Sequence, residues 1–443
     1  MAFSFLHGVH VPHRKNTQSM AAVAMPSPKT VTIPMSMHIG APAKPIVKVG
    51  QLVKVGTLIA EAGGFVSAPI YASVSGKVTK ITEYLLSNGT SVPAVVIESD
   101  GEMTPDEAMT PPVVDSRDSL LEAIKQSGVV GLGGAGFPTH VKFAVDPARI
   151  EHLIINGAEC EPYSTSDTRT MIDRVADMKR ALEAMKQYFG IHDIVIGIEN
   201  NKKEAVKSMM GLMNQVAEAG KCSFTVKVLP AMYPQGGEKV LIYHTVGRTV
   251  PVGKLPIDVG CIVINCTTLA AIGAYLETGM PLVEKCVTVD GGAVKEPKNV
   301  IVPIGTSMAD VFAFCGGLTE EPSKVVYGGP MMGVTVPDTA APILKNTNGV
   351  LALTAKETKL PATTPCIRCG ACTNTCPFGL APANIAKAYK NKDADALERL
   401  SVNACMECGC CSFVCPANRP LVQTNKLAKT FLKEEKAKED TKA

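Results

Sequence analysis

"CIRCGACTNTCP", residues 366–377, determines how the C-terminal part of this chain folds, because residues 405–416, "CMECGCCSFVCP", repeat its spacing. Both stretches read C-x2-C-x2-C-x3-C-P, the pattern of bacterial ferredoxins, in which three closely spaced thiolates hold one cluster and the fourth reaches the other. A zinc site needs only four ligands, which does not explain why the same four-cysteine run occurs twice. The spacing therefore predicts two [4Fe-4S] clusters, and Pro377 and Pro416 end the two runs.

One predicted cluster draws its ligands from both runs, at Cys366, Cys369, Cys372 and Cys415. The other draws them in the converse way, at Cys405, Cys408, Cys411 and Cys376. Cys410 lies outside the pattern and is expected to be a packed thiol beside a cluster. The other cysteines stand among apolar neighbours and are expected to fill cores: Cys160, Cys222, Cys261, Cys266, Cys286 and Cys315. Fifteen cysteines without a signal-peptide pattern are typical of a reducing compartment and of metal binding.

The rest of the chain reads as a multidomain α/β and β protein. Over residues 119–280, strands such as "HLIIN" and "CIVIN" alternate with helical stretches, which predicts a Rossmann-like parallel α/β domain. Residues 281–340 predict a β-grasp domain of the soluble-ligand-binding type, and residues 341–360 a linker. The ferredoxin-like two-cluster module then takes residues 361–425, and a charged tail, expected to be a frayed helix, takes residues 426–443.

Residues 1–103 predict an N-terminal β domain of short strands. Its two V-x-V-G units, Val47–Gly50 and Val53–Gly56, resemble the small β-barrel of biotinyl and lipoyl carrier domains. The hairpin "EAGGFVS", residues 61–67, lacks the lysine that a carrier modifies, so we expect a structural or docking role instead. Residues 104–118 are proline-rich and acidic, which indicates a linker to the next domain.

Charge and hydropathy limit the partners of the chain. A net charge of +3 over 443 residues does not suggest nucleic-acid binding. No acidic residue precedes Glu61 although several lysines and arginines do, so this region is either a solvated face or a contact for anionic lipid headgroups or an acidic partner. The charge-free stretch Val259–Leu276 alternates like a strand leading into a helix and predicts buried core. Any membrane contact is therefore expected to be peripheral.

"GLGGAG", Gly131–Gly136, fits the glycine spacing of dinucleotide-binding loops but not their usual context. Such a loop follows a strand and opens a helix, whereas here a predicted helix, "SLLEAIKQSG", comes first and Pro138 interrupts the stretch after the loop. Glycines still let a backbone lie against a flat or phosphorylated ligand, and Lys142 adds a cation. The loop is therefore expected to bind a nucleotide through Gly131, Gly133, Gly134, Gly136 and Lys142.

"GLGGAGFPTHVKF" followed by "LIINGAECEPYSTSD" resembles the flavin- and NADH-binding subunit of respiratory complex I. The whole chain is still more similar to the C subunit of Rnf electron-transport complexes, because the resemblance also includes "FLHGVHVPHRK" (residues 5–15), "PQGGEKVLI" (residues 234–242), "GGPMMG" (residues 328–333) and the paired cysteine runs. It implies a noncovalent FMN and an NADH site in one pocket, besides the two clusters.

Further site residues are implied by that resemblance alone. Asn156 and Glu159 would hydrogen-bond the flavin, and Glu161 would lie near the nicotinamide. "MYPQGGE" would place Tyr233 and Glu238 at the pocket, and "VINCTTL" would place Asn265 and Thr268 there. The chain departs from the complex I pattern at Ala158, Gly237 and Ile264, where that family has Asp, Glu and Asn.

By resemblance, the chain would be the NAD-side subunit of a membrane-bound ferredoxin:NAD oxidoreductase, peripheral on the cytoplasmic face. It would exchange hydride between NADH and FMN and pass single electrons through two [4Fe-4S] clusters, while other Rnf subunits move an ion and connect it indirectly to ferredoxin. No side chain is expected to act as nucleophile or general base. Two alternatives are a flavin iron-sulfur cobalamin reductase and a purely electron-wiring subunit without flavin.

Overall fold

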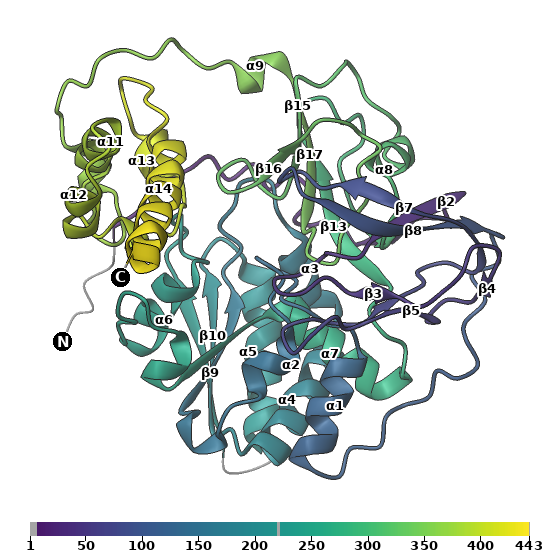
Figure 1. The fold of residues 1–443 in the computed structure, drawn as a ribbon. Coiled ribbons are helices and arrows are strands. Elements are labelled where there is room, and N and C mark those ends of the chain that lie inside the picture. Colours follow the sequence, from purple (N-terminus) through teal and green to yellow (C-terminus); the bar gives the residue numbers. More distant parts are fainter. Residues whose placement is uncertain (1–6, 219–221, 443) are drawn as a thin grey trace.

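The computed structural model describes residues 7–218 and 222–442, arranged with a helical module at one end and a β-barrel domain at the other (Figure 1). The α/β domain and a central β-sheet lie between them. Phe5 and Leu6, which open the N-terminal motif, lie outside the described residues. The multidomain fold expected from the sequence is confirmed.

The barrel domain consists of two small antiparallel sheets. Its strands are β2 (Thr30–Pro34), β8 (Ser91–Ser99), β7 (Gly76–Leu85) and β4 (Leu52–Val53) in one sheet, and β3 (Lys44–Pro45), β5 (Leu58–Glu61) and β6 (Ile70–Tyr71) in the other. Alternate residues such as Val31 and Ile33 are fully buried, which is the period-two pattern of a half-buried strand. The barrel domain docks on the next domain, because the backbone N–H of Ile39 donates to Gly136 O at 3.2 Å.

The α/β domain contains a four-stranded parallel sheet in the order β11-β10-β9-β12. Its strands are β9 (His152–Gly157), β10 (Asp193–Glu199), β11 (Ser223–Leu229) and β12 (Cys261–Asn265). Helices α1 (Arg117–Gln126), α3 (Ser166–Asp173), α4 (Val175–Phe189), α5 (Lys203–Glu218) and α7 (Cys266–Thr278) share one core with Leu153 and Ile155. Helix α6 (Glu238–Val246) packs with Ile154 on the other face. Helices therefore cover both faces, as a doubly wound fold requires.

The charge-free stretch Val259–Leu276 forms β12 and most of α7, so the prediction of buried core is confirmed. Among the residues that the structure describes, no helix is both long enough and apolar enough to cross a membrane.

A six-stranded mixed sheet forms the centre of the molecule, in the order β1-β14-β13-β17-β15-β16. Its strands are β1 (Val23–Ala24), β13 (Glu284–Asp290), β14 (Lys298–Pro303), β15 (Lys324–Tyr327), β16 (Val334–Val336) and β17 (Gly349–Leu353), with α8 (Met308–Phe314) packed on it. This domain draws on more of the chain than residues 281–340, because β1 comes from the N-terminal segment and β17 from the stretch expected to be a linker. The buried pattern of β17, from Gly349 to Leu353, explains why it joins the sheet.

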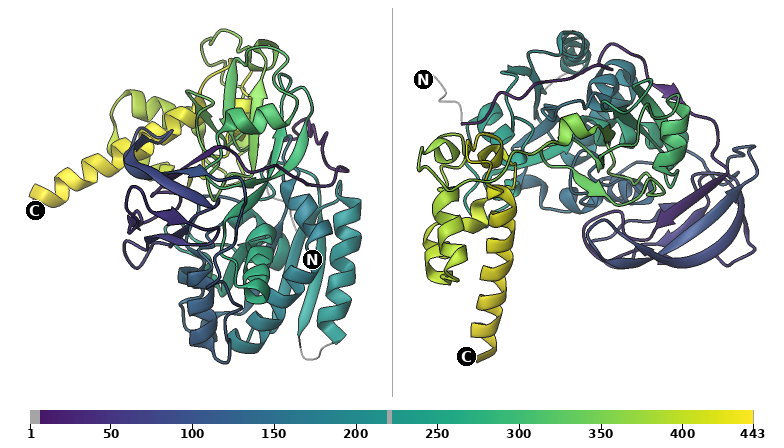
Figure 2. Two further views of the ribbon diagram at one scale, coloured as in Figure 1. Left: turned by 90° about the vertical axis from the view of Figure 1, so that its right-hand side faces the viewer. Right: turned by 90° about the horizontal axis from the view of Figure 1, so that it is seen from above.

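The helical module contains α10 (Ala371–Asn374), α11 (Pro382–Lys390), α12 (Ala394–Arg399), α13 (Cys410–Phe413) and α14 (Leu421–Lys442), and comes after the short α9 (Ala355–Thr358). Its two cysteine runs fold alike. Left-handed residues recur at equivalent places, at Arg368, Gly370 and Gly379 in the first run and at Glu407, Gly409 and Asn418 in the second. The expected charged tail is the outer part of α14, a continuous helix that projects from the body of the molecule (Figure 2).

The basic residues near the N-terminus have different surroundings. Lys15 is partly buried, and Arg14 and Lys54 form ion pairs with Glu357 and Glu107. Lys29, Lys44 and Lys48 are exposed, so a contact of this region with an acidic partner or anionic lipid stays a prediction.

Candidate functional site

The carboxyl ends of β9 and β12 form the natural ligand site of the α/β domain. Strand order reverses between these two strands, and open α/β sheets bind ligands at such a switch point. Asn156 lies near the end of β9 and pairs in register with Asn265, which ends β12. Two of the residues implied by the family resemblance therefore lie side by side at the expected place.

The glycine loop crosses this switch point, although it precedes β9 instead of connecting it to a helix. The backbone N–H of Leu132 donates to Thr268 Oγ1 at 2.9 Å. A Cβ on Gly133 would lie 2.4 Å from Asn265 Nδ2, so only glycine fits there, whereas the space around Gly134 is open. Gly133 and Gly134 are exposed, which leaves a glycine backbone surface facing outward beside the start of α7.

Neighbouring domains hold the loop in place. Lys285, a fully buried residue on β13, donates to the carbonyl of Leu132. Asn346 Nδ2 donates to the carbonyl of Gly134 at 3.1 Å, and the carbonyl of Gly136, whose φ is +73°, accepts from the backbone N–H of Ile39. Gly131 N–H donates to Phe137 O within the loop itself. Burial lowers the pKa of Lys285 to about 7.

Asn265 and Thr268 shape the start of α7. Asn265 Oδ1 accepts from the backbone N–H groups of Thr267 and Thr268, and its Nδ2 donates to Asp167 Oδ2 at 2.7 Å. These contacts use the side chain of Asn265 as a helix N-cap. Their effect on the site is to aim the N-terminus of α7, which carries a partial positive charge, at the glycine loop.

Lys142 and Glu238 face each other across the same opening. Lys142 Nζ donates to Val263 O at 3.0 Å and lies 3.3 Å from Glu238 Oε1, and both side chains are partly exposed. Asn156 Nδ2 donates to Gly236 O at 2.9 Å, which ties the end of β9 to the segment before α6.

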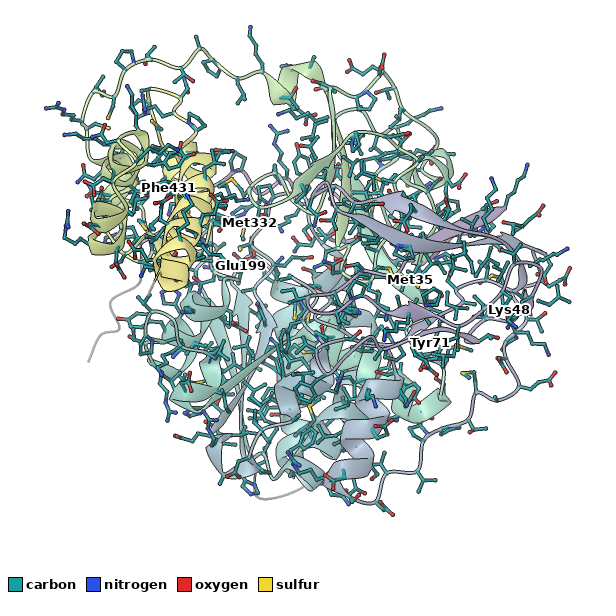
Figure 3. The ribbon with its side chains drawn as sticks, viewed as in Figure 1. Met35, Lys48, Tyr71, Glu199, Met332 and Phe431 are labelled. Carbon is teal, nitrogen blue, oxygen red and sulfur yellow. The ribbon has the colours of Figure 1, made fainter. Side chains whose placement is uncertain are left out.

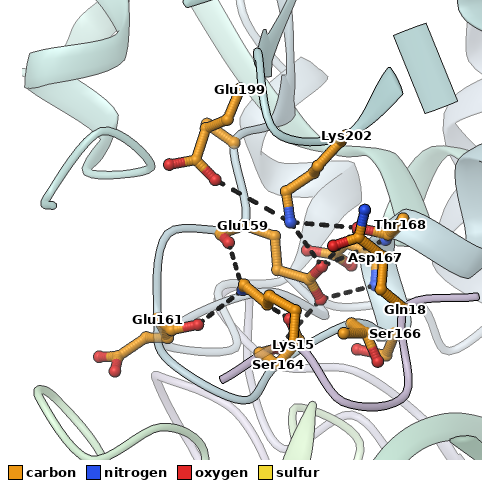
Figure 4. A network of polar contacts seen from close by, with 12 residues as sticks. Lys15, Gln18, Glu159, Glu161, Ser164, Ser166, Asp167, Thr168, Glu199 and Lys202 are labelled. Atoms are coloured by element: carbon orange, nitrogen blue, oxygen red, sulfur yellow. Dashed lines mark hydrogen bonds and ion pairs between the residues drawn. The ribbon is translucent and has the colours of Figure 1, made fainter. Parts of the chain in front are cut away.

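Glu159 is buried, and its carboxylate lies in a network of polar side chains (Figure 4). Its carboxylate accepts from Ser164 Oγ, from the backbone of Asp167, from Thr168 Oγ1 and from Lys202 Nζ. Burial alone would raise the pKa of Glu159, but the charges of Lys202 and Lys15 outweigh burial and lower it. These contacts tie the carboxylate of Glu159 to the loop after β9 and the start of α3, and its assignment to the flavin stays a prediction.

Lys15, from the N-terminal segment, completes this network. Its Nζ donates to three backbone carbonyls of one loop: Glu159 O at 2.7 Å, Glu161 O at 2.7 Å and Ser164 O at 2.6 Å. Burial, with a further contribution from Lys202, lowers the pKa of Lys15 to about 8. No local pattern indicates that this lysine, far from β9 along the chain, organises the loop.

The carboxylate of Glu161 binds the central domain. It accepts from the backbone N–H groups of Met331 at 3.0 Å and Met332 at 2.7 Å, and Met332 lies between the central sheet and the helical module (Figure 3). Burial raises the pKa of Glu161 to about 7, against the two hydrogen bonds, which lower it. The motif "GGPMMG" therefore binds the carboxylate of Glu161, a contact that the sequence did not predict.

Tyr233 contacts the helical module. Its side chain is only 1% exposed, and its hydroxyl donates to Cys408 O at 2.6 Å. The family resemblance placed Tyr233 at the nucleotide pocket, but its hydroxyl is engaged by a backbone carbonyl of the second cysteine run.

Four thiols of the predicted second cluster line one cavity. It is bounded by Cys376, Cys405, Cys408 and Cys411, together with the extra thiol of Cys410 and apolar neighbours such as Met406 and Val422. In residues 7–218 and 222–442, no three His, Cys, Asp or Glu side chains converge on a point suited to one metal ion. Thiols around a cavity fit a cubane, which needs room between its ligands, so these residues fit the predicted group.

The thiols of the other predicted cluster lie toward the outside. Cys366 and Cys369 are exposed, whereas Cys372 is buried in the same apolar cluster against which Cys415 packs. Cys376 packs with Cys405 in a separate apolar cluster. Cys376 therefore lies with the second run. Cys415 packs against a cluster that contains both Cys372 and Cys411, so its pairing with the first run stays a prediction.

Comparison with known proteins matches this architecture along the chain. Residues 3–102 match the RnfC barrel sandwich hybrid domain, and residues 124–274 match the Nuo51 FMN-binding domain. Residues 286–335 match the SLBB domain, and residues 362–435 match a 4Fe-4S dicluster domain.

Two curated relatives extend over most of the chain. The C subunit of the Na(+)-translocating ferredoxin:NAD(+) oxidoreductase complex of Acetobacterium woodii is 41% identical over 431 residues, which are 96% of each chain. The C subunit of the proton-translocating ferredoxin:NAD(+) oxidoreductase complex of Clostridium ljungdahlii is 41% identical over 395 residues, 87% of this chain and 84% of that one. Because these relatives are subunits of complexes, other subunits are implied here too.

A chain of an NAD+-reducing [NiFe]-hydrogenase, solved in its H2-reduced state, shares the fold with a TM-score of 0.50 at 18% identity, over 72% of this chain and 61% of that one. The identity to the two curated relatives, over nearly the whole length, decides the family. The chain belongs to the C subunits of the Rnf complexes, the ion-translocating ferredoxin:NAD+ oxidoreductases, and has their FMN-binding and [4Fe-4S] domains.

Proposed function

We propose that this chain is the NAD-side module of its complex, which exchanges paired electrons with NAD(H) at the glycine loop and single electrons with a partner subunit through its cysteine sites. A bound FMN supplies the conversion between electron pairs and single electrons. Partner subunits would couple this exchange to ion transport, connect the chain indirectly to ferredoxin, and hold it peripherally at the cytoplasmic face of a membrane.

The observation that carries the proposal is the direct contact between the two kinds of site. Asn156, at the switch point, bonds Gly236, and a Cβ on the neighbouring Gly237 would lie 2.4 Å from Met406 Cε in the second cysteine run. Met406 lines the cavity of the buried thiols. A few residues of one segment therefore separate the nucleotide site from the inner cysteine site.

The chain's own residues have distinct tasks at the nucleotide site. The exposed backbone of Gly133 and Gly134 admits a flat ring system, because no Cβ intervenes. The N-terminus of α7 favours the negative charge of a phosphate, and Lys142 adds a cation near Glu238. None of these residues needs to gain or lose a proton, so binding and orientation are the protein's contribution.

The two cysteine sites have different surroundings, which favours different tasks. The site lined by Cys405 and Cys408 is enclosed and adjoins the nucleotide domain. The loop from Cys366 to Gly370 is exposed, and 68% of the accessible area of Ile367 remains open. We assign the inner site to exchange with the flavin side and the outer site to exchange with a partner subunit.

The alternatives receive less support. A cobalamin reductase is disfavoured because the similarity to an Rnf C subunit covers 96% of the chain, the N-terminal barrel domain included. A wiring subunit without flavin is disfavoured because the glycine loop keeps its open backbone surface and its fixed position at the switch point.

An anaerobic reconstitution with FMN, iron and sulfide tests the proposal. The expected result is about one FMN and about eight irons per chain, with flavin absorbance that bleaches on addition of NADH. Protein that holds eight irons but no FMN, and that ignores NADH, would support the wiring subunit and refute the proposal.

A further inference from the structure

The segment Tyr233–Gly237 is packed between the inner cysteine site and the nucleotide site, whose residues lie far apart along the chain. At one end, the hydroxyl of Tyr233 donates to Cys408 O at 2.6 Å, and Cys408 is a predicted ligand of the inner cluster. At the other end, Gly236 O accepts from Asn156, and the Gly236 N–H donates to Cys160 Sγ at 3.3 Å. Both ends are therefore held by hydrogen bonds to the residues of different sites.

Tyr233 is held on every side. Its backbone N–H donates to Val9 O at 3.0 Å, and its carbonyl accepts from Val9 N–H at 2.8 Å. The preceding Gly8 permits this approach, because a Cβ there would lie 2.4 Å from Tyr233 O. Val9, Tyr233, Cys408 and Cys410 share one small apolar cluster. The ring is thus pinned by the N-terminal segment on one face and by the cysteine run on another.

A hydrogen bond to the backbone carbonyl of a cysteine that ligates the cluster acts on the cluster in two ways. It fixes the orientation of the ligand residue, and it places a positive dipole end near the negatively charged thiolates. Hydrogen bonding, burial and charge around the sulfurs set the potential of an iron-sulfur cluster. Tyr233 supplies two of these at Cys408: a hydrogen bond to the backbone carbonyl, and burial by a ring that is itself almost fully buried.

We infer that Tyr233 is the positioning residue of the inner cluster, and that the Tyr233–Gly237 segment holds that cluster and the flavin site in register with each other. This inference rests on the proposed function and adds to it a structural link that neither cofactor motif contains. Loss of the hydroxyl should lower the potential of the inner cluster, since a donor that stabilises the reduced, more negative state is removed, and leave the outer cluster unchanged.

Tyr233→Phe tests the hydroxyl with the ring in place. Tyr71→Phe is a matched control, because Tyr71 is also a buried tyrosine whose hydroxyl donates to a backbone carbonyl, Gln126 O at 2.5 Å, but in the barrel domain far from the helical module (Figure 3). The measurement is a redox titration of the reconstituted full chain followed by electron paramagnetic resonance, with iron and FMN contents determined on the same samples.

Gly236→Ala tests the other end of the Tyr233–Gly237 segment. Its Cβ would lie 2.2 Å from Ala158 O, so the segment would have to move away from the end of β9, where Asn156 now bonds Gly236. We expect Tyr233→Phe to shift the potential and line shape of one cluster with FMN content unchanged. We expect Gly236→Ala to lose FMN about tenfold more readily with both cluster signals retained. Tyr71→Phe should change neither.

The inference is overturned if Tyr233→Phe keeps wild-type potentials for both clusters, or if it shifts both equally. The proposed function would instead be refuted by a wild-type chain whose clusters dithionite reduces at a potential that NADH attains but NADH leaves oxidised. The comparison of cluster potentials would still decide the role of Tyr233.

Discussion

Replacement of Lys202 by Met should strongly destabilise the α/β domain. Lys202 is fully buried, lies 3.1 Å from Glu159 Oε2, and is also 3.9 Å from Glu199 Oε2 (Figure 4). Its removal leaves two buried carboxylates with Lys15 as the remaining cation that acts on both. Removing one partner of a buried ion pair costs about 3–5 kcal/mol, because the remaining charge is uncompensated.

The destabilisation caused by Lys202→Met should decrease as pH falls. In the wild type the folded-state pKa of Glu159 lies below its unfolded value, because Lys202 and Lys15 outweigh burial. Glu159 therefore contributes stability that is present above its unfolded pKa and is lost as pH falls through its folded pKa. Without Lys202, burial raises the folded pKa of Glu159, so the destabilisation of Lys202→Met should be largest near neutral pH and shrink on acidification.

Native-state hydrogen exchange measures the free energy of opening at individual amides, so it can report the stability of the α/β domain separately from that of the other domains. The free energy of opening for β9 and β10 amides should fall by about 3–5 kcal/mol in Lys202→Met and recover in part when Glu159→Gln is added. Lys203→Met is the matched control, because Lys203 is the exposed neighbour. A loss below about 1 kcal/mol, or one equal at pH 5 and pH 7, would refute the reasoning, since a partner of a solvated ion pair contributes only that much.

Three further predictions concern the cofactor sites. Gly133→Ala should lower FMN retention at least about tenfold, because its Cβ would lie 2.4 Å from Asn265 Nδ2 and the loop would have to shift away from the flavin. Equilibrium dialysis measures the FMN that remains bound. Cys376→Ser should remove the resonance signal of the inner cluster and Cys415→Ser that of the outer one, since the ferredoxin spacing assigns each fourth cysteine to the opposite run. Glu161→Gln should flatten the fall in melting temperature between about pH 5 and about pH 7, because burial raises the folded-state pKa of Glu161 to about 7 and stability is lost as pH rises through it.

Each of these predictions has its own contrary outcome. Gly211→Ala, in an open position on α5, should keep wild-type FMN content, and equal losses in both glycine variants would argue against a specific loop geometry. If Cys376→Ser abolished the signal of the outer cluster instead, the fourth cysteines would not cross between runs. A wild-type melting temperature independent of pH in that window would contradict the raised pKa of Glu161.

Local patterns in the sequence predicted the site's framework well. Cysteine spacing reflects cluster geometry, so it predicts that Cys376 serves the second run and Cys415 the first. Cys376 lines the cavity of the second run's thiols, and the pairing of Cys415 stays a prediction. The glycine loop was predicted to fall outside the usual strand-to-helix context. It follows helix α1 and not a strand, as predicted, but a short helix, Thr139–Phe143, begins directly after Pro138. Family resemblance placed Asn156 and Asn265 at one edge of the sheet, where they pair in register.

The features that the sequence could not predict depend on contacts between distant segments. Lys15 organises the loop after β9 only because the N-terminal segment crosses the molecule, and β17 joins the central sheet although its surroundings read as a linker. Glu159 and Tyr233 were implied as pocket residues because their motifs match the family's, but the partners of a side chain are set by packing. Lys202 donates to the carboxylate of Glu159, and the hydroxyl of Tyr233 donates to Cys408 O; neither partner could be read from the motifs.

The most direct test of the account is an anaerobic titration of the reconstituted full chain with NADH, followed by flavin absorbance and by electron paramagnetic resonance of the clusters together. The account predicts that roughly two equivalents of NADH supply four electrons, two to the flavin and one to each cluster, when the cluster potentials lie within reach of NADH. Bleaching of the flavin with no cluster signal, under conditions where dithionite reduces both clusters at a potential that NADH attains, would contradict the claim that one polypeptide connects the two kinds of site.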